Sequence, residues 1–342
     1  MSRLRDVPLS ALDLATITTG TDARAALAHT RELARLVERL GFTRFWLAEH
    51  HNMPGIASSS PAILIGHVAD ATTTLRVGSG GVMLPNHPPL VVAEQFGTLS
   101  ALHPGRIDLG IGRAPGTDQR TAQALRRTTG PLSVDDFPQQ LAELNGYFDG
   151  TEQLLAVPAQ GNKPDVFLLG SSGYSAQVAG LLGLPFAFAH HFSAENTLPA
   201  LALYRERFRP SARLSEPYAL VCASVLVADT DERARYLAQP GALSFLRLRS
   251  GRPGPMATNE EADAYPYTDV ERLFVEDRMA SQVIGSPSTV EAGLEALLAD
   301  TAADELMVTT MVAEQSDRLR SYELLAQIAQ RSSERVKTEV EV

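Results

Sequence analysis

Eight short apolar segments, each followed by a longer segment with helical periodicity, run through most of this sequence. The strand-like segments cover residues 7–15, 44–49, 75–84, 106–112, 166–170, 185–192, 218–228 and 304–312. Parallel strands need long crossover connections, and a helix after each strand supplies them. Eight such units predict an α/β fold, the (β/α)8 TIM barrel, with an insertion before the last strand. A doubly wound open sheet is the alternative that this pattern leaves open.

The segment 247–267 interrupts the alternation between the seventh and eighth strands. It is polar and rich in proline and glycine, with the sequence "RLRSGRPGPMATNEEADAYPY". Long irregular loops in compact domains often serve as lids over active sites, so we expect a lid here, with a surface excursion as the alternative. No linker or repeat divides the chain, which predicts one barrel domain over residues 1–335 and a frayed tail over residues 336–342.

Charge and cysteine content narrow the classes of partner. The formal net charge is −10 and no basic cluster stands out, which argues against nucleic acid and anionic membranes. The single cysteine, Cys222, cannot form an intrachain disulfide. No apolar run reaches the roughly 20 residues that span a bilayer, and the first residues lack the apolar region of a signal peptide. We therefore expect a cytoplasmic protein.

Polar residues collect where the expected strands end, beginning with "RFWLAEHHNMPG" at the end of the second strand. Neighbouring residues on a strand point to opposite faces. If His50 faces a pocket, His51 must therefore face the surrounding shell, or the reverse. The carboxyl ends of TIM-barrel strands carry the active site, so this stretch is a candidate for catalysis. A solvated strand end is the simpler interpretation.

The segment "LLGSSGYSAQ" (168–177) joins an expected strand to an expected helix through small hydroxyl and glycine residues. Backbone N–H groups at a helix N-terminus, with serine hydroxyls beside them, form an anion-binding site. We interpret five residues as a phosphate cradle: Ser171, Ser172, Gly173, Tyr174 and Ser175. An ordinary serine N-cap is the alternative.

Two further segments carry candidate ligand contacts. Arg113, in "LGIGRAPGTD", follows the fourth strand and can pair with a phosphate through two hydrogen bonds, although a solvated loop arginine is possible too. Gly80 and Gly81 lie within the third strand, where glycine marks a bulge or the close approach of a ligand. A flat aromatic ring stacked on this strand would need such a bare surface, and a plain bulge explains the glycines equally well.

Three segments together resemble the bacterial luciferase-like flavin monooxygenase superfamily. They are "WLAEHHNMPGIASSSPAILIGHVA", "GSGGVMLPNHPPLVVAEQFGTL" and "PGRIDLGIGRAPGTD". The resemblance covers about residues 5–330 and is specific for the family, though not for a substrate. It implies a TIM barrel, usually a homodimer, that binds FMN and uses its reduced form to activate O2.

The resemblance also implies roles for residues at the FMN phosphate. Arg113 matches the family arginine at that phosphate. The phosphate segment of the family aligns with Ser171, Ser172 and Ser175. The luciferase α subunit has an acidic residue in place of Ser171, so this chain departs from it there.

At the flavin ring, Gly80–Gly81 fall where the family has a non-prolyl cis peptide beneath the isoalloxazine. His50 matches the histidine that luciferases use near the flavin reaction centre, and His51 matches its neighbour. The resemblance thus implies His50 and Glu49 as catalytic residues, with His50 facing the flavin while Glu49 and His51 position the strand end.

The activity implied is that of a flavin-dependent monooxygenase, in which reduced FMN and O2 oxidise a small organic substrate through a peroxyflavin intermediate. A histidine can handle the protons of such a reaction near pH 7. An apolar wall of Leu14, Trp46, Val82 and Met83 would exclude water. The eight strands account for the chain and leave no fused reductase domain, so we expect a separate flavin reductase to supply reduced FMN.

Three other interpretations remain. A metal-dependent hydrolase would use His50, His51, His190, His191 and Asp13, but adjacent histidines on a strand cannot easily bind one ion, and we expect no metal. A flavin-binding protein without turnover is the second interpretation. The third is a deazaflavin-dependent hydride-transfer oxidoreductase of the same fold.

Overall fold

A computed structural model of the chain describes residues 4–114, 116–126 and 136–340. Its strands are β1 (Leu9–Asp13), β2 (Arg44–Leu47), β3 (Arg76–Met83), β4 (Ile107–Gly112), β5 (Asp165–Gly170), β6 (Phe186–Phe188), β7 (Ala219–Val227), β8 (Val283–Gly285) and β9 (Glu305–Thr309). Eight of them form a parallel sheet in the order β6-β5-β4-β3-β2-β1-β9-β7, and the pairing of β6 with β7 closes it into a ring. The predicted (β/α)8 barrel is confirmed, and each of its eight strands lies within a predicted segment or within one residue of it.

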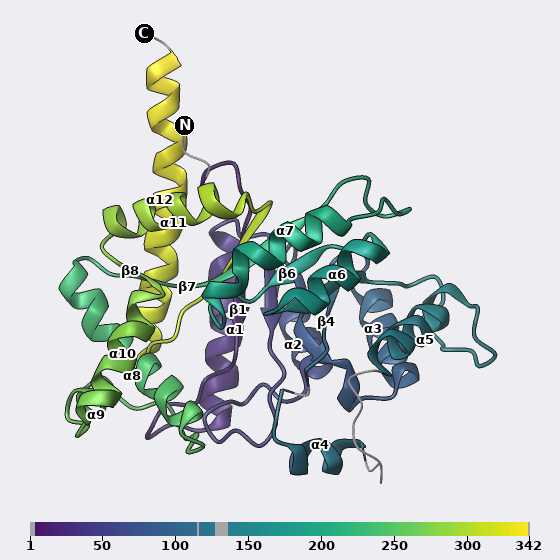
Figure 1. Ribbon diagram of the computed structural model, residues 1–342, viewed down its shortest axis with the longest axis horizontal. Coiled ribbons are helices and arrows are strands. Elements are labelled where there is room, and N and C mark those ends of the chain that lie inside the picture. Colours follow the sequence, from purple (N-terminus) through teal and green to yellow (C-terminus); the bar gives the residue numbers. More distant parts are fainter. Residues whose placement is uncertain (1–3, 115, 127–135, 341–342) are drawn as a thin grey trace.

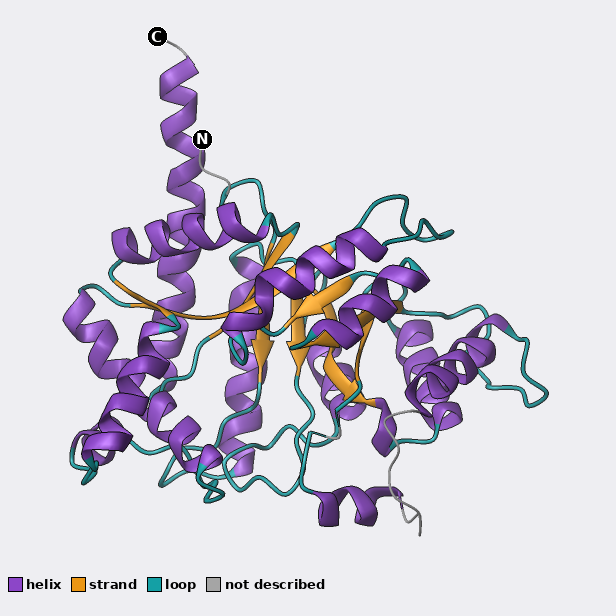
Figure 2. Cartoon of the chain, in the orientation of Figure 1, coloured by secondary structure: helices purple, strands orange, loops and turns teal. Residues whose placement is uncertain are grey.

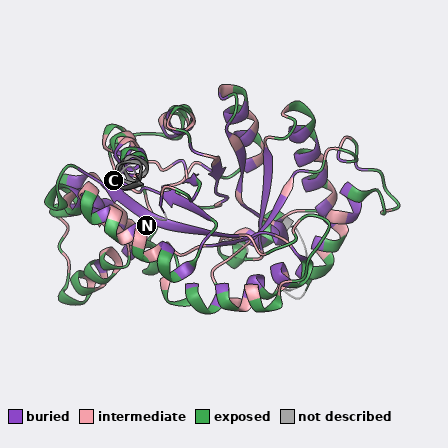
Figure 3. Cartoon of the chain, turned by 90° about the horizontal axis from the view of Figure 1, so that it is seen from above, coloured by how far each residue is buried: buried purple, intermediate pink, exposed green. Residues whose placement is uncertain are grey.

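Helices surround the barrel, as Figures 1 and 2 show. They are α1 (Ala23–Arg39), α2 (Pro61–Ala71), α3 (Pro89–Leu102), α4 (Gln119–Arg126), α5 (Phe137–Asp149), α6 (Gly173–Leu182), α7 (Thr197–Arg207), α8 (Asp231–Arg249), α9 (Asn259–Asp263), α10 (Asp269–Ala280), α11 (Pro287–Thr301) and α12 (Gln315–Val340). Seen from above, the strands are buried at the centre and the helices expose their outer faces (Figure 3). Within the described ranges, no helix combines the length and apolar character of a bilayer-spanning segment.

Helix α1 shows how local sequence signals set these elements. The side chain of Asp22 caps it by accepting a hydrogen bond from the backbone N–H of Ala25 at 2.8 Å. Gly41, at a φ of +83°, follows its last turn, where glycine adopts the left-handed conformation without a steric cost. Leu33 and Val37, four residues apart, are buried on the face that packs toward the barrel.

The insertion before the last strand is confirmed, but it is more regular than the sequence analysis predicted. Helix α8 continues to residue 249, α9 lies inside the segment 247–267, and α10 and β8 follow without having been predicted. The added strand β8 pairs with the end of β7, outside the ring. Both α9 and α10 begin with a capping box, Thr258 with Glu261 and Thr268 with Glu271. This T-x-x-E spacing can be recognised in the sequence. The two helices were not predicted because their polar composition was interpreted as that of a loop.

Two further predictions extend to residues that the structure does not describe. The helical segment predicted after the fourth strand corresponds to α4 and α5, and residues 127–135 between them lie outside the described ranges. Helix α12 reaches Val340 and so overlaps the frayed tail predicted over residues 336–342. The predicted tail therefore includes helical residues up to Val340, and residues 341–342 are not described.

A network of charges occupies the barrel at the amino ends of the strands. Arg44, the first residue of β2, donates to Asp108 at 2.8 Å and to both oxygens of Glu305 at 3.0 Å. Both carboxylates are fully buried, and Arg76 also pairs with Asp108. Although burial works to lower it, the two carboxylates raise the pKa of the Arg44 guanidinium above its ordinary value. Charge thus fills the end of the barrel opposite the site that the sequence analysis predicts.

Asp13, at the end of β1, forms a second buried ion pair rather than a metal site. Its carboxylate accepts a hydrogen bond from the guanidinium of Arg318 on α12 at 2.6 Å, and from the hydroxyl of Thr30 on α1. Burial opposes ionisation, but Arg318 and these hydrogen bonds hold the pKa of Asp13 below its ordinary value. Asp13 therefore ties two helices to the barrel.

We expect Asp13→Asn to lower the free energy of unfolding by about 3–5 kcal/mol, because it leaves the buried Arg318 guanidinium without its counter-charge. Urea titration followed by circular dichroism at pH 7 measures this. The matched control is Asp149→Asn, which breaks an exposed pair with Lys163 and should cost no more than about 1 kcal/mol. Equal effects of the two substitutions would contradict a structural role for the Asp13 pair.

Candidate active site

A cavity of about 430 Å³ opens at the carboxyl ends of the barrel strands. Its base is apolar and includes Leu12, Trp46, Leu220 and Met307, whose side chains pack in the barrel interior. Loops that follow the strands form its walls. A concave, mostly apolar space of this size with a few polar groups is typical of small-molecule sites, and this end of the barrel is where such sites lie.

Of the four residues predicted to form an apolar wall, three line this cavity: Leu14, Trp46 and Met83. Val82 instead packs in the hydrophobic core between the barrel and its helices. The alternation of side chains along β3 gives the reason, because Val82 and Met83 must point to opposite faces.

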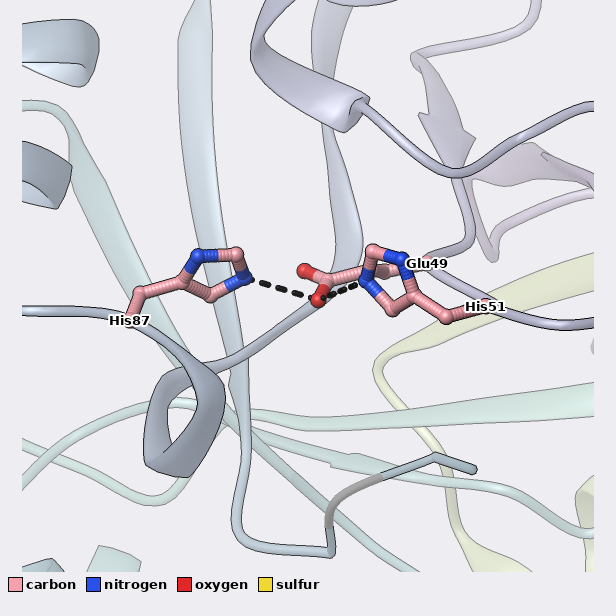
Figure 4. A group of neighbouring side chains, drawn as sticks. All are labelled: Glu49, His51 and His87. Atoms are coloured by element: carbon pink, nitrogen blue, oxygen red, sulfur yellow. Dashed lines mark hydrogen bonds and ion pairs between the residues drawn. The ribbon is translucent and has the colours of Figure 1, made fainter. Parts of the chain in front are cut away.

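Glu49 is a fully buried carboxylate just beyond the end of β2. Its Oε1 lies 2.9 Å from Nε2 of His51 and 2.7 Å from Nε2 of His87, and its Oε2 accepts a hydrogen bond from the backbone N–H of Met83 at 3.1 Å (Figure 4). An ionised carboxylate only accepts hydrogen bonds, so both imidazoles carry a proton on Nε2. Burial would raise the pKa of Glu49, but these bonds, foremost that of His87, hold it below its ordinary value.

The two adjacent histidines lie in different surroundings, as predicted, although both belong to the loop after β2 and not to the strand itself. His50 lines the cavity, whereas Glu49 and His51 lie behind the wall, in contact with each other. Burial is the main cause that lowers the pKa of His50, so its imidazole is neutral near pH 7. Its Nδ1 lies 3.5 Å from the carbonyl oxygen of Gly116. The structure therefore presents one neutral imidazole to the cavity and holds the other on a carboxylate.

His87 is a site residue that the sequence analysis did not assign. It lies in "MLPNHPP" after β3, a strand end of the kind from which other candidates were taken. These three residues could also hold a metal ion: one ring nitrogen of His87, one of His51 and one carboxylate oxygen of Glu49 all lie within 4.8 Å of one another. Because both imidazoles already donate to Glu49, hydrogen bonds satisfy the three groups without an ion.

The residues of the predicted phosphate cradle gather at the start of α6. Ser172 is its N-cap residue, but its side chain makes no capping hydrogen bond and faces the cavity instead, together with Ser171 and Ser175. Gly173 and Tyr174 form the first turn of the helix behind them. The guanidinium of Arg113 lies over the ring of Tyr174, 4.0 Å from its centre, and also lines the cavity. A fixed cation thus stands beside a helix N-terminus with unused hydroxyls.

Gly80 and Gly81 line the cavity and are joined by a cis peptide bond. The pairing of β3 with β4 also shifts register around them, so the segment is a bulge as well as a cavity wall. A Cβ atom on Gly80 would lie 2.7 Å from Cδ1 of Leu12, and one on Gly81 would lie 2.8 Å from the carbonyl oxygen of Gly110. A contact with backbone therefore requires glycine at position 81, whereas a side chain at position 80 would displace that of Leu12; the sequence analysis did not foresee these contacts.

The second pair of adjacent histidines lies in a loop, because β6 ends at Phe188 rather than at the predicted residue 192. His190 hydrogen-bonds to the hydroxyl of Thr197 at 2.8 Å. His191 lines the cavity, and its Nδ1 lies 3.1 Å from the carbonyl oxygen of Cys222. Burial is the largest cause that lowers the pKa of His191, to about 4. It is thus a second neutral imidazole in the cavity.

The segment 247–267, predicted to be a lid, borders the cavity. Its backbone is held at Met256, whose N–H donates to the carbonyl of Ile17 at 2.8 Å and whose carbonyl accepts from the N–H of Thr19 at 2.8 Å. Four of its residues line the cavity: Leu248, Pro253, Gly254 and Met256. The segment lies where a lid must lie, and its role as a moving lid stays a prediction.

Comparisons with known proteins match this architecture. A family model described as luciferase-like monooxygenase matches residues 8–305. A luciferase-like monooxygenase of Escherichia coli strain K12 is 48% identical over 323 residues, which cover 94% of this chain and 96% of that protein. Length and coverage agree, so the similarity extends over the whole barrel.

Solved structures give the same result. The crystal structure of apo-MsnO8 matches with a TM-score of 0.87 at 38% sequence identity, covering 95% of this chain and 98% of that one. A type II Baeyer–Villiger monooxygenase was solved in complex with FMN; it is the oxygenating constituent of 3,6-diketocamphane monooxygenase from Pseudomonas putida. It matches with a TM-score of 0.71 at 19% identity, covering 94% of this chain and 98% of that one, and shows the fold alone.

We expect His191 to titrate with a midpoint near 4, as its burial requires. In the unfolded chain the midpoint is about 6.5. Because folding lowers the pKa, stability is complete above pH 6.5 and declines as the pH falls toward 4. NMR titration of the histidine C2 protons, assigned with His191→Gln, measures the midpoint, and the variant should lose less stability between these pH values. A midpoint at the unfolded value would show that His191 is solvated.

Proposed function

The chain belongs to the luciferase-like monooxygenase family, and we propose that it uses reduced FMN and O2 to oxidise a small organic substrate. One observation carries the proposal. A single cavity joins an anion-binding corner, formed by Arg113 and the N-terminus of α6, to a neutral imidazole, His50, across an apolar base. A phosphorylated cofactor with an extended aromatic ring fits that division of polar and apolar surface.

The anion-binding corner suits a phosphate because its hydrogen-bond donors are available to a ligand. The hydroxyl of Ser172 does not cap its own helix, and the first N–H groups of α6 have no partner within the helix, at an end where Ser171 and Ser172 line the cavity. Arg113 is held by its contact with the Tyr174 ring, and among the described residues no carboxylate pairs with it. A guanidinium without a carboxylate partner can bind a phosphate through two hydrogen bonds.

The rest of the cavity suits a flavin ring. Gly80 and Gly81 leave the wall of β3 without side chains, and Leu12 and Trp46 supply apolar surface beneath it. Bound FMN would supply the redox chemistry, and the protein would supply its placement and shielding from water. The apolar base and the segment around Met256 would exclude solvent from the reacting groups.

His50 is the group that we assign to proton transfer. Its Nδ1 faces the carbonyl of Gly116, which leaves Nε2 as the atom that exchanges a proton with the reactants. Burial keeps the imidazole neutral and able to accept that proton. Glu49 acts as a positioning residue: it fixes His51 and the β3 backbone and so fixes the direction of His50 between them.

Two further elements of the proposal come from the family resemblance. A separate reductase would supply reduced FMN, and the active form would be a homodimer. The segment 247–267 would act as the lid over substrate, as its position at the cavity supports.

Arg113→Ala should weaken FMN binding at least about tenfold, because a charge-assisted hydrogen bond contributes about 1.5–3 kcal/mol. Fluorescence titration with FMN measures the affinity, and circular dichroism checks that the variant is folded. Arg120→Ala, on the exposed side of α4, is the matched control and should bind as the wild type does. Unchanged affinity of Arg113→Ala would remove this arginine from the cofactor site.

His50→Ala should keep FMN affinity within a few-fold and speed the reoxidation of bound reduced FMN by O2, with hydrogen peroxide released in place of product. The reason is that His50 follows β2, whereas the residues of the phosphate corner follow β4 and β5. His51→Ala should mainly lower stability, because His51 contacts Glu49 behind the wall. Stopped-flow absorbance, a peroxide assay and thermal unfolding measure these effects, and an exchange of effects between the two variants would refute the assignment.

A further inference from the structure

A second arginine lines the same cavity, and it has no counter-charge among the described residues. Arg278, on α10, lies with its guanidinium over the ring of Phe245, 4.1 Å from the ring centre. Its Nε is buried and has no hydrogen-bond partner. Throughout the described ranges, no carboxylate pairs with this side chain, whereas Arg44, Arg76 and Arg318 all have one.

A guanidinium that is withdrawn from water without a counter-charge destabilises the folded protein unless a ligand pairs with it. Burial lowers the pKa of the Arg278 guanidinium, and no neighbouring carboxylate offsets that effect. The stacked ring of Phe245 offers only partial compensation, since a cation above an aromatic face gains about 0.5–2 kcal/mol. Charges that are partly withdrawn from water are ordinarily paired, so the half-buried guanidinium of Arg278, unpaired within the described ranges, points to an anionic ligand at this wall of the cavity.

Two hydroxyls in the same cavity also lack partners. The Oγ of Ser244, on α8, and the Oγ1 of Thr309, at the end of β9, are buried and make no hydrogen bond within the described part of the chain. Hydroxyls of this kind usually find a partner in the protein. Three unsatisfied polar groups from three elements therefore border one space, and each is independent of the others.

These groups are distinct from the phosphate corner. Arg113 and Ser172 follow β4 and β5, whereas α8 follows β7 and α10 packs on α8. Strand β6 separates the two regions in the ring, and Figure 1 shows α8 and α10 on one side of the barrel and α6 on the other. A flavin with one phosphate occupies one cationic corner and leaves the other for a second molecule.

We propose that Arg278 binds the carboxylate of an organic-acid substrate, with the hydroxyls of Ser244 and Thr309 available to its other polar groups. Carboxylate matches the planar, two-pronged geometry of guanidinium. The inference deepens the proposed function by naming the substrate class. His191 lines the same cavity as Arg278 and His50.

The test uses two probes of equal length, hexanoate and hexanamide, and isothermal titration calorimetry on the purified protein without flavin. The wild type should bind hexanoate at least about tenfold more tightly than hexanamide. Arg278→Gln should abolish that preference, and Arg278→Lys should keep part of it because the charge remains. The matched control is Arg272→Gln, on the exposed side of the same helix, which should keep the full preference.

Three results would overturn the proposal. They are equal or undetectable binding of the two probes to the wild type at millimolar concentration, a preference that survives in Arg278→Gln, and a loss of FMN affinity in Arg278→Gln of the size expected for Arg113→Ala. The last result would assign Arg278 to the cofactor instead. Because the probes are titrated without flavin, the outcome stands whether or not the protein oxidises anything with FMN.

Discussion

The buried carboxylate of Glu49 is the constraint on which the site depends. It holds His51, His87 and the backbone of Met83 in one hydrogen-bonded group, and so joins the ends of β2 and β3 behind the cavity wall. With Glu49 and His51 held on the shell side, His50 between them lines the cavity. The orientation of His50, the histidine that we propose for proton transfer, thus depends on a residue that does not line the cavity.

Charge is distributed unequally along the barrel. At the amino ends of the strands, Arg44 is matched by the carboxylates of Asp108 and Glu305, and these pairs stabilise the fold. At the carboxyl ends, Arg113 and Arg278 face an apolar cavity, and no carboxylate within the described ranges pairs with either. Ion pairs that satisfy each other contribute structure, whereas cations left unpaired are available to ligands. The cavity therefore offers two separate cations, each of which can bind an anionic group of a ligand.

The sequence predicted the barrel well because its signal is repetitive: eight apolar runs alternate with helices, and an error at one boundary does not change the count. It also predicted that polar residues at strand ends would meet, including His50 and Ser172. It did not reveal His87, whose partner Glu49 is distant in sequence, or Arg278, which belongs to a helix that was not predicted. The packing around Gly80 was equally hidden, because the neighbouring Leu12 comes from another strand. Contacts between elements are set by the fold and not by local patterns.

A crystal structure of the complex with oxidised FMN tests the central claim most directly, because the claim concerns where each end of the cofactor lies. We expect the phosphate within hydrogen-bonding distance of the Arg113 guanidinium and the Ser172 hydroxyl, with the isoalloxazine against Gly80–Gly81 and His50 beside it. Arg278 should remain free of the cofactor. A phosphate bound at Arg278, or a ring outside the cavity, would contradict this assignment of the two ends.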